Sequence, residues 1–458
     1  PESPMKIMQG CTTENLGLDG MSVAPIDDEG KESWRAHLSG LAGKYPVDWK
    51  WNSFGEYIDA IDAVKPAVNI CSYVGLGTVR RKVMGMKAGD ASREDMAQMK
   101  TLVEEAMQQG ARGISAGLIY PPSQFQTMNE MIELAEVAAK YNGVLDVHMR
   151  NEANDIEQAM DEVFEIGRRS GIRVLITHFK VRGRKNWGRS QSLLEKLDGA
   201  RAEGIDVTIA QYPYTAGSTF LHAVIPPWYQ EGGVDNFLAS LAGRMDDIRK
   251  DIKERNDWEN FAQSAGWDKI IVSSVENDTN RDCEGKFISE ITEMRGYRDH
   301  VETVCKLLVE EQLAVGMIAF GLDEGDVRTI MQHPAVSIIT DGLLSGSRPH
   351  PRVVATFPRV LGRYVREQKV LTLEEAVRKM TSLPADKLRL TNKGLVRQGF
   401  DADLVIFDED KVLDTNSYED PLKPPVGIEH VIVDGAQAVK EGEQLKVRTG
   451  RTIRSRCR

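Results

Sequence analysis

Apolar positions along the chain alternate between two periods, one typical of buried strands and one typical of amphipathic helices. The stretch 144–190 contains both, because two apolar runs of strand length end at His148 and at His178. Gly171 stops a helical pattern between these runs, whose recurring apolar residues are Ile156, Met160, Val163 and Ile166. This order predicts strand, helix, strand, which is the βαβ unit of a parallel sheet.

The same alternation of helix and short apolar strand extends over most of the chain, for example at 93–120 and 190–211. An irregular, charged stretch at about 222–300 interrupts it, as a lid-like insertion would. Near residue 393 it gives way to short strands separated by glycine turns. The sequence therefore predicts an α/β protein with a parallel α/β barrel at 1–392 and a small β domain at 393–458.

Polar side chains at the predicted strand ends are candidates for a metal site. His148 and His178 leave the carboxyl ends of their strands, which form the catalytic face of a parallel barrel. A single histidine at such a place is more often structural, but two of them can meet at one metal ion. Asp19 follows another predicted strand in "GLDG", where it fits a turn as well as a ligand. Arg150 and Lys180 each stand two positions after a histidine, and cations beside a metal fit an anionic substrate.

Other strand ends carry side chains suited to catalysis or substrate binding. An apolar run ends in "TDG" at Asp341, whose carboxylate could serve as general base for a water activated by the metal. Tyr212 and Tyr214 follow another strand, where a phenol could donate to a substrate carbonyl or simply pack. Further candidates for substrate contacts are Tyr120, Arg348 and Arg352.

Composition narrows the class of protein. A formal net charge of −11 argues against a general nucleic-acid binder, and no apolar run is long enough to span a bilayer. The beginning of the chain lacks a secretory apolar region. The five cysteines are scattered without CxxC pairs, which favours reduced thiols in a cytoplasmic protein. We expect a small molecule as the partner, neither nucleic acid nor membrane, and the sequence leaves the oligomeric state open.

Together these segments resemble the N-acyl-D-amino-acid deacylases (D-aminoacylases) of the amidohydrolase superfamily. The likeness runs from about Met8 to Lys446 and rests on several motifs in order, which makes it specific. The motifs are "QGCTTENLGLDGMSVAP", "GISAGLIYPPSQF", "HMRNE", "THFKVRGRKNWG", "QYPYTAGSTFL", "TDG", "RPHPRVVATFPRVLGRY" and "GFDADLVIFD". The resemblance implies a (β/α)₈ barrel with a small β-sandwich built from both chain ends. It also implies one tightly bound zinc ion on His148 and His178, allows a second ion, and matches Asp341 to the family's catalytic aspartate.

Three departures from the family pattern affect these expectations. Asp19 stands where the family has a metal-binding cysteine, and a carboxylate is a harder donor that could favour Mn²⁺ or Co²⁺. Leu76 in "GLG" replaces the histidine of the usual GHG. The His-x-His strand that opens these barrels does not occur, so we expect the first barrel strand and the N-terminal share of the small domain to be missing.

These features predict metal-dependent hydrolysis of the amide bond of N-acyl-D-amino acids, which releases a D-amino acid and a carboxylate. Asp341 would transfer the proton, a tyrosine of "QYPY" would stabilise the oxyanion, and Lys180 with an arginine would hold the α-carboxylate. One alternative is a cyclic amidase of the hydantoinase or dihydroorotase type, although the carboxylated lysine usual in those enzymes has no counterpart at a strand end. The other is a non-catalytic, metal-poor relative, which the changes at Asp19 and Leu76 and the expected absence of the first strand motivate.

Overall fold

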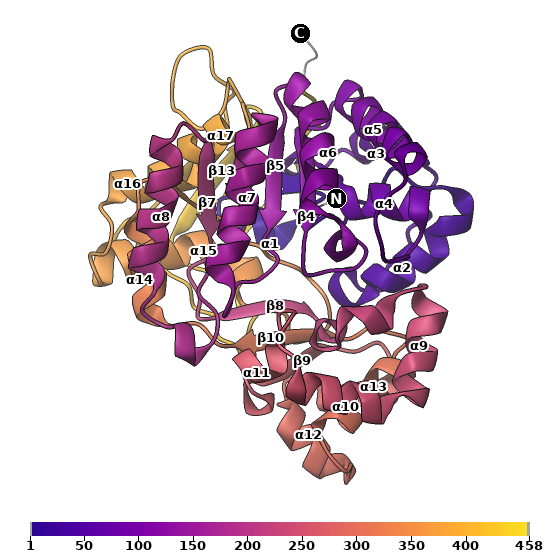
Figure 1. The fold of residues 1–458 in the computed structure, drawn as a ribbon. Helices are drawn as coiled ribbons and strands as arrows, with labels where there is room; N and C mark the ends of the chain where they lie inside the picture. The colour runs from indigo at the N-terminus through magenta and orange to yellow at the C-terminus, as the bar shows by residue number, and fades with distance from the viewer. Residues whose placement is uncertain (1, 456–458) are drawn as a thin grey trace.

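Parallel strands form the wall of a barrel in the computed structural model, which describes residues 2–455 (Figure 1). Six strands pair in parallel in the order β11-β7-β6-β5-β4-β3. β2 precedes β3 on the other side of Tyr73 and pairs in parallel with β1. The bounds are β1 (Thr13–Leu16), β2 (Asn69–Ser72), β3 (Val74–Gly75), β4 (Gly113–Gly117), β5 (Val144–His148), β6 (Arg173–Ile176), β7 (Val207–Gln211) and β11 (Val336–Ile338).

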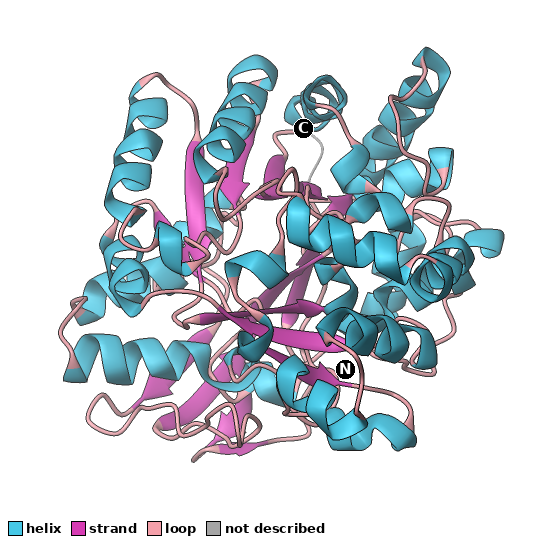
Figure 2. Cartoon of the chain, turned by 60° about the horizontal axis from the view of Figure 1, so that its bottom comes forward, coloured by secondary structure: helices cyan, strands magenta, loops and turns pink. Residues whose placement is uncertain are grey.

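Amphipathic helices lie around the outside of these strands (Figure 2). Their ends follow local chemistry: the side chains of Ser92 and Thr127 accept backbone hydrogen bonds in capping boxes, and Gly171 ends a helix at a φ of 68°. The apolar faces of most of these helices pack with the strands into one large core. The bounds are α3 (Phe54–Ala63), α4 (Leu76–Met84), α5 (Arg93–Gln108), α6 (Met128–Lys140), α7 (Ile156–Ser170), α8 (Ser190–Ala202), α14 (Glu324–Gln332), α16 (Leu373–Met380) and α17 (Ser382–Lys387).

A separate unit is inserted between β7 and α14 and lies below the barrel in Figure 1. Its antiparallel sheet has the order β8-β10-β9, and its side chains form a core of their own. The stretch predicted as a lid-like insertion, about 222–300, lies within this unit, which we call the insertion (residues 216–320). Its elements are β8 (Ala216–Phe220), α9 (Val234–Gly243), α10 (Met245–Glu254), α11 (Phe261–Ser264), β9 (Ile270–Ser274), α12 (Ile288–Arg295), α13 (His300–Glu310) and β10 (Gly316–Phe320).

Antiparallel strands near the end of the chain form a separate four-stranded sheet in the order β12-β13-β14-β15. The predicted combination of an α/β barrel with a small β domain is therefore confirmed. Within residues 2–455, no helix is both long and apolar enough to cross a bilayer. The remaining elements are α1 (Pro4–Ile7), α2 (Asp28–Ala42), α15 (Arg352–Arg359), the π-helix η7 (Val360–Glu367), β12 (Leu404–Phe407), β13 (Ile428–Val433), β14 (Ala436–Lys440) and β15 (Glu443–Gln444).

The register of the parallel strands brings their carboxyl ends to one edge. Gly117 at the end of β4 is paired with His148 at the end of β5. In the same way Gln211 at the end of β7 is paired with Ile338 at the end of β11. Side chains that directly follow these strands therefore gather at a single face, which is where parallel barrels place their catalytic groups.

Candidate active site

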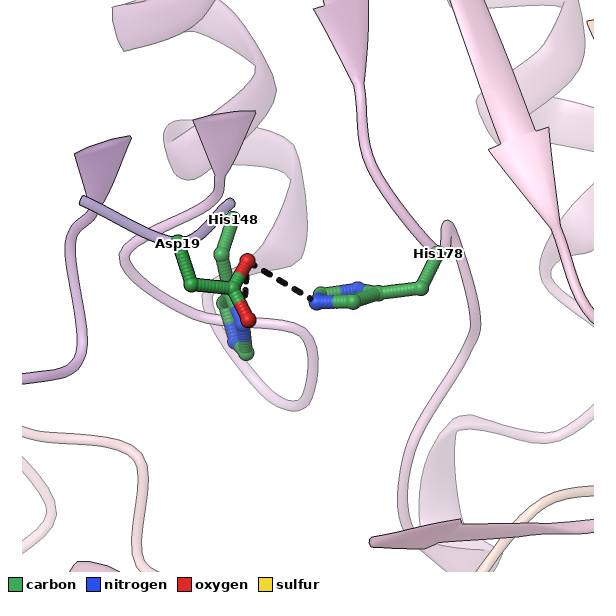
Figure 3. Close-up of side chains that lie close together, drawn as sticks. All are labelled: Asp19, His148 and His178. Carbon is green, nitrogen blue, oxygen red and sulfur yellow. Dashed lines mark ion pairs between the residues drawn. The ribbon is translucent and has the colours of Figure 1, made fainter. Parts of the chain in front are cut away.

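Three side chains from different strand ends converge at this edge (Figure 3). His148 is the last residue of β5, His178 follows β6 by two residues, and Asp19 follows β1 by three. The carboxylate oxygen Oδ1 of Asp19 lies 3.5 Å from Nε2 of His178 and 3.9 Å from Nδ1 of His148. The two imidazole rings are 4.3 Å apart between centroids. This arrangement brings one oxygen and two nitrogen donors to a common point.

The donor set fits a divalent metal ion. His148 and His178 are each only 3% exposed. Neither ring nitrogen of His148 has a hydrogen-bond partner, and neither does Oδ1 of Asp19. Buried polar atoms are rarely left unpaired, so unpaired atoms that face one another need a further partner. One ligand atom from each of the three residues lies within 4.8 Å of the others. Imidazole nitrogens together with a carboxylate oxygen are ligands that zinc accepts.

Burial and charge act differently on the two histidines. Burial lowers the pKa of His148 to about 3, so its ring is neutral. Burial and Lys180 also lower the pKa of His178. The carboxylates of Glu152 and Asp19 raise this pKa by more, so that the net result is a pKa of about 9. Although burial raises the pKa of Asp19, the nearby His178 ring, His148 and Lys180 hold that pKa below its ordinary value. A metal ion at this point would replace the proton on His178, because metal binding needs a neutral imidazole.

Three site residues have left-handed backbone conformations. The φ angles are 54° for Asp19, 37° for His178 and 46° for Asp341. Such angles are unfavourable for residues with a Cβ atom and occur preferentially at functional sites. Gly117 on β4 helps to admit the Asp19 loop, because a Cβ atom at this glycine would come within 2.3 Å of the Asp19 carbonyl oxygen. The chain is therefore bent specifically to present these side chains.

Asp341 faces the same cavity as the two histidines. The cavity has a volume of about 1400 Å³ and is lined by Asp19, His148, His178 and Asp341. Asp341 follows β11 by three residues, and its Oδ2 accepts an ion pair from Arg352 at 2.7 Å. Arg352 is 1% exposed and belongs to the same cavity wall. The structure thus brings the predicted base and the predicted ligands together.

Tyr212, Tyr120 and Lys180 also line this cavity. The hydroxyl of Tyr212 has no hydrogen-bond partner, and burial raises its pKa, so the phenol keeps its proton. The Tyr212 ring lies near two cations, 4.5 Å from the Arg352 guanidinium and 5.7 Å from Nζ of Lys180. The hydroxyl of Tyr120 lies 2.9 Å from Oγ1 of Thr219, so this tyrosine links the barrel to the insertion.

Three other predicted site residues lie outside the lining of this cavity. Arg150 pairs with Glu162 at 2.9 Å and donates to backbone carbonyls of the loop 124–126. Arg348 donates to the backbone carbonyl of Glu419. The ring of Tyr214 lies against the guanidinium of Arg359, at 4.6 Å. The structure therefore does not bring Arg150 and Arg348, which were predicted to bind substrate, or Tyr214, which was predicted to be catalytic, to the cavity that holds the two histidines.

Sequence reasoning missed the carboxylate of Glu152, which is fully buried beside the two histidines. It accepts hydrogen bonds from Lys180 at 2.6 Å and lies 3.1 Å from Nδ1 of His178. Burial raises the pKa of Glu152, but Lys180 and the histidines hold it well below the ordinary value. Its position four residues after His148, in "HMRNE", was a usable signal. Lys180 is therefore already paired with a protein carboxylate.

Comparison with known proteins identifies the family. Residues 283–439 match the amidohydrolase family. The chain is 35% identical to a D-aminoacylase of Alcaligenes xylosoxydans xylosoxydans over 452 residues, which are 98% of this chain and 82% of the relative. It is 34% identical to an N-acyl-D-glutamate deacylase of the same organism over 454 residues, 99% of this chain and 82% of the relative. The chain belongs to the D-aminoacylase family of amidohydrolases.

Solved structures of D-aminoacylase family members have the same fold. N-acyl-D-glutamate deacylase from Bordetella bronchiseptica, complexed with zinc and a phosphonate inhibitor, superposes with a TM-score of 0.82 at 31% identity. The match covers 99% of this chain and 85% of that structure. A D-aminoacylase superposes with a TM-score of 0.79 at 32% identity, again over 99% of this chain and 85% of that one. The resemblance suggested by the motifs is confirmed over nearly the whole chain.

Proposed function

We propose that this protein is a zinc-dependent hydrolase that cleaves the amide bond of N-acyl-D-amino acids and releases a D-amino acid and a carboxylate. The observation that carries the proposal is the convergence of Asp19, His148 and His178 on one cavity with Asp341. Its family membership supports the same activity, since relatives are named D-aminoacylase, N-acyl-D-glutamate deacylase and N-acyl-D-aspartate deacylase.

The zinc ion would be held by Asp19, His148 and His178, whose donor atoms face one another in a buried place. When bound, zinc supplies Lewis-acid chemistry, since it polarises a carbonyl oxygen and lowers the pKa of water. His148 is ready to bind because burial keeps its ring neutral. The Asp19 carboxylate adds a negative charge that a family cysteine would supply as a thiolate.

Asp341 is the proposed proton carrier. Its carboxylate takes a proton from the attacking water and passes that proton to the nitrogen of the leaving amine. The ion pair with Arg352 fixes the direction in which the carboxylate points. Because Arg352 itself lies in the cavity wall, the same guanidinium can also attract the α-carboxylate of the substrate.

Tyr212 is the proposed donor to the oxyanion. It keeps its proton because burial raises its pKa, and its hydroxyl has no protein partner to compete with the substrate. A donor placed where negative charge develops stabilises the transition state more than the ground state. Lys180 lies in the same wall, where its ammonium adds positive charge near the α-carboxylate while it remains paired with Glu152.

A panel of N-acetyl-D- and N-acetyl-L-amino acids, assayed for released amine, tests this function. Protein stripped with a chelator and reloaded with zinc should release amine from D-substrates and should be at least about tenfold slower on their L-counterparts. Zinc content should rise to a constant ratio per chain as activity returns. Zinc-loaded protein that releases amine from none of the D-substrates would refute the proposed activity.

A further inference from the structure

The carboxylate of Glu152 occupies the centre of a buried cluster behind the metal site. Its two oxygens each lie 2.6 Å from Nζ of Lys180, and Oε1 lies 3.1 Å from Nδ1 of His178. Oε2 lies 3.5 Å from a guanidinium nitrogen of Arg182. None of these residues is more than 6% exposed. Glu152 therefore connects one candidate metal ligand to two buried cations.

The contacts of Nδ1, with Oε1 of Glu152 at 3.1 Å and with Nζ of Lys180 at 2.8 Å, set how His178 can face a metal. A ring nitrogen held by a carboxylate fixes the orientation of the imidazole and leaves the other nitrogen for the metal. In this structure the other nitrogen is Nε2, which is the atom that faces Asp19 at 3.5 Å. Glu152 thus has the geometry of an outer carboxylate that orients a histidine ligand.

The insertion supplies a second buried carboxylate to the same cluster. Glu259, which is 2% exposed, accepts a hydrogen bond from the backbone N–H of Glu152 at 2.7 Å. Its other oxygen pairs with Nε of Arg182 at 2.8 Å. The guanidinium of Arg182 lies 4.3 Å from the centre of the Phe261 ring, and Phe261 lines the cavity. A short segment of the insertion therefore holds the backbone of Glu152 and the side chain of Arg182.

Stability alone does not account for this arrangement. Two carboxylates and two cations are taken out of water here, and such buried charges commonly contribute little net stability compared with apolar side chains. Positional precision is the advantage that a fully paired buried cluster can offer. This cluster holds Glu152, four positions after His148, against Glu259, which comes more than a hundred positions later in the chain.

We propose that Glu259 is a positioning residue through which the insertion holds the metal site: Glu259 fixes the Glu152 backbone and Arg182, and Glu152 in turn fixes His178. This inference rests on the proposed function, because it assumes that His178 binds zinc. It adds a role for the insertion that is separate from contacts with the substrate.

Zinc affinity, measured by competition with a chromophoric chelator, is the direct test. Glu152→Gln should weaken zinc binding by about 10- to 100-fold, as loss of an outer-shell partner does. Glu259→Ala should weaken it by about tenfold, and Glu259→Gln by less, because glutamine keeps an acceptor for the N–H of Glu152. If Glu259 acts through Glu152, zinc should bind the double variant Glu152→Gln/Glu259→Ala no more weakly than it binds Glu152→Gln.

Glu311 provides a matched control in the insertion. It is also a carboxylate that is 2% exposed, and it accepts backbone hydrogen bonds from Glu276 at 2.7 Å and Asn277 at 2.9 Å. Glu311→Ala should lower the melting temperature and leave zinc affinity within about twofold. Equal zinc affinity in the wild-type protein and Glu259→Ala, or additive effects in the double variant, would overturn the inference. Absence of zinc binding in the wild-type protein would instead refute the proposed function.

Discussion

Two pairs of buried histidines lie close together in this molecule in opposite surroundings. The rings of His148 and His178 are 4.3 Å apart, and those of His37 and His222 are 5.4 Å apart. All four side chains are at most 5% exposed. The first pair faces Asp19 and Glu152, whereas the second lies among aromatic rings, which are those of Trp34, Phe220 and Phe237.

Nearby carboxylates distinguish the first histidine pair from the second. Burial lowers the pKa of His37 to about 4 and that of His222 well below its ordinary value. Among the described residues, no carboxylate contributes to either pKa. His178 is just as deeply buried, yet Glu152 and Asp19 raise its pKa to about 9. Proximity of two imidazoles is therefore not enough to indicate a metal site; the oxygen donors around them decide.

The largest effect should come from exchanging one ring in each pair for phenylalanine. His148→Phe removes a ligand, so zinc should be lost and turnover should fall on the order of 10⁴-fold, because a metal ion supplies several kcal/mol of transition-state stabilisation. The His222 ring is stacked on Phe220 at 3.8 Å between centroids. His222→Phe should keep a ring in this place and should retain zinc and activity within about twofold. Metal analysis and amine release measure both. Zinc retention by His148→Phe would contradict the assignment of the first histidine pair, and not the second, to the metal site.

A smaller loss should follow from Asp341→Asn, which separates catalysis from metal binding. Zinc content should stay at the wild-type level, since Asp341 is not one of the three proposed ligands. Turnover should fall about 10³-fold, because the variant lacks the carboxylate that carries the proton. Asp414→Asn is the control: this carboxylate is also buried and paired with an arginine, Arg359, at 2.7 Å, and its loss should leave turnover nearly unchanged. Full activity in Asp341→Asn would contradict its role as the base.

Acid should destabilise the folded protein through the second histidine pair. The pKa of His37 is lowered from 6.5 to about 4 on folding, so the unfolded chain takes up the proton first as the pH falls. The contribution of His37 to the free energy of unfolding is fully present above pH 6.5. It is lost progressively as the pH falls towards 4, by up to about 3 kcal/mol. Urea unfolding of the wild-type protein and His37→Phe at pH 8 and pH 4.5 measures it. The variant should lose less stability between these two pH values; equal losses would remove His37 as the cause.

The smallest contrast concerns two tyrosines two positions apart. Tyr212→Phe removes the proposed oxyanion donor and should lower kcat about 10²-fold. Tyr214→Phe should change kcat by less than about twofold, because Tyr214 lies against Arg359 outside the cavity lining. Steady-state kinetics on one D-substrate distinguishes them. A similar loss in both variants would mean that the second tyrosine also affects the reaction.

Much of the barrel and of the metal site could be predicted from local patterns. The helical spacing that ends at Gly171 and the apolar runs before His148 and His178 are local signals, and the structure has α7, β5 and β6 there. The position of a side chain after a strand end is harder to predict. Lys180 and Arg150 each follow a histidine by two residues, yet Lys180 lines the cavity and Arg150 pairs with Glu162.

Contacts between distant parts of the chain could not be predicted. Glu259 meets Glu152 across 107 positions, and its segment has no regular apolar spacing to indicate which way it faces. The contact between His222 and His37 could not be predicted from the sequence either. His37 lies on α2, and the two rings meet only because the insertion packs against that helix. Sequence patterns place strand ends well, but the neighbours of a buried charge depend on tertiary packing.

The left-handed backbone at Asp19, His178 and Asp341 sets a limit on engineering this protein for heat resistance. Glycine at any of these positions would relieve roughly 1 kcal/mol of conformational strain. A redesign that selects only for thermostability would therefore favour glycine at the three positions that carry the proposed chemistry. The resulting protein would be more stable but inactive.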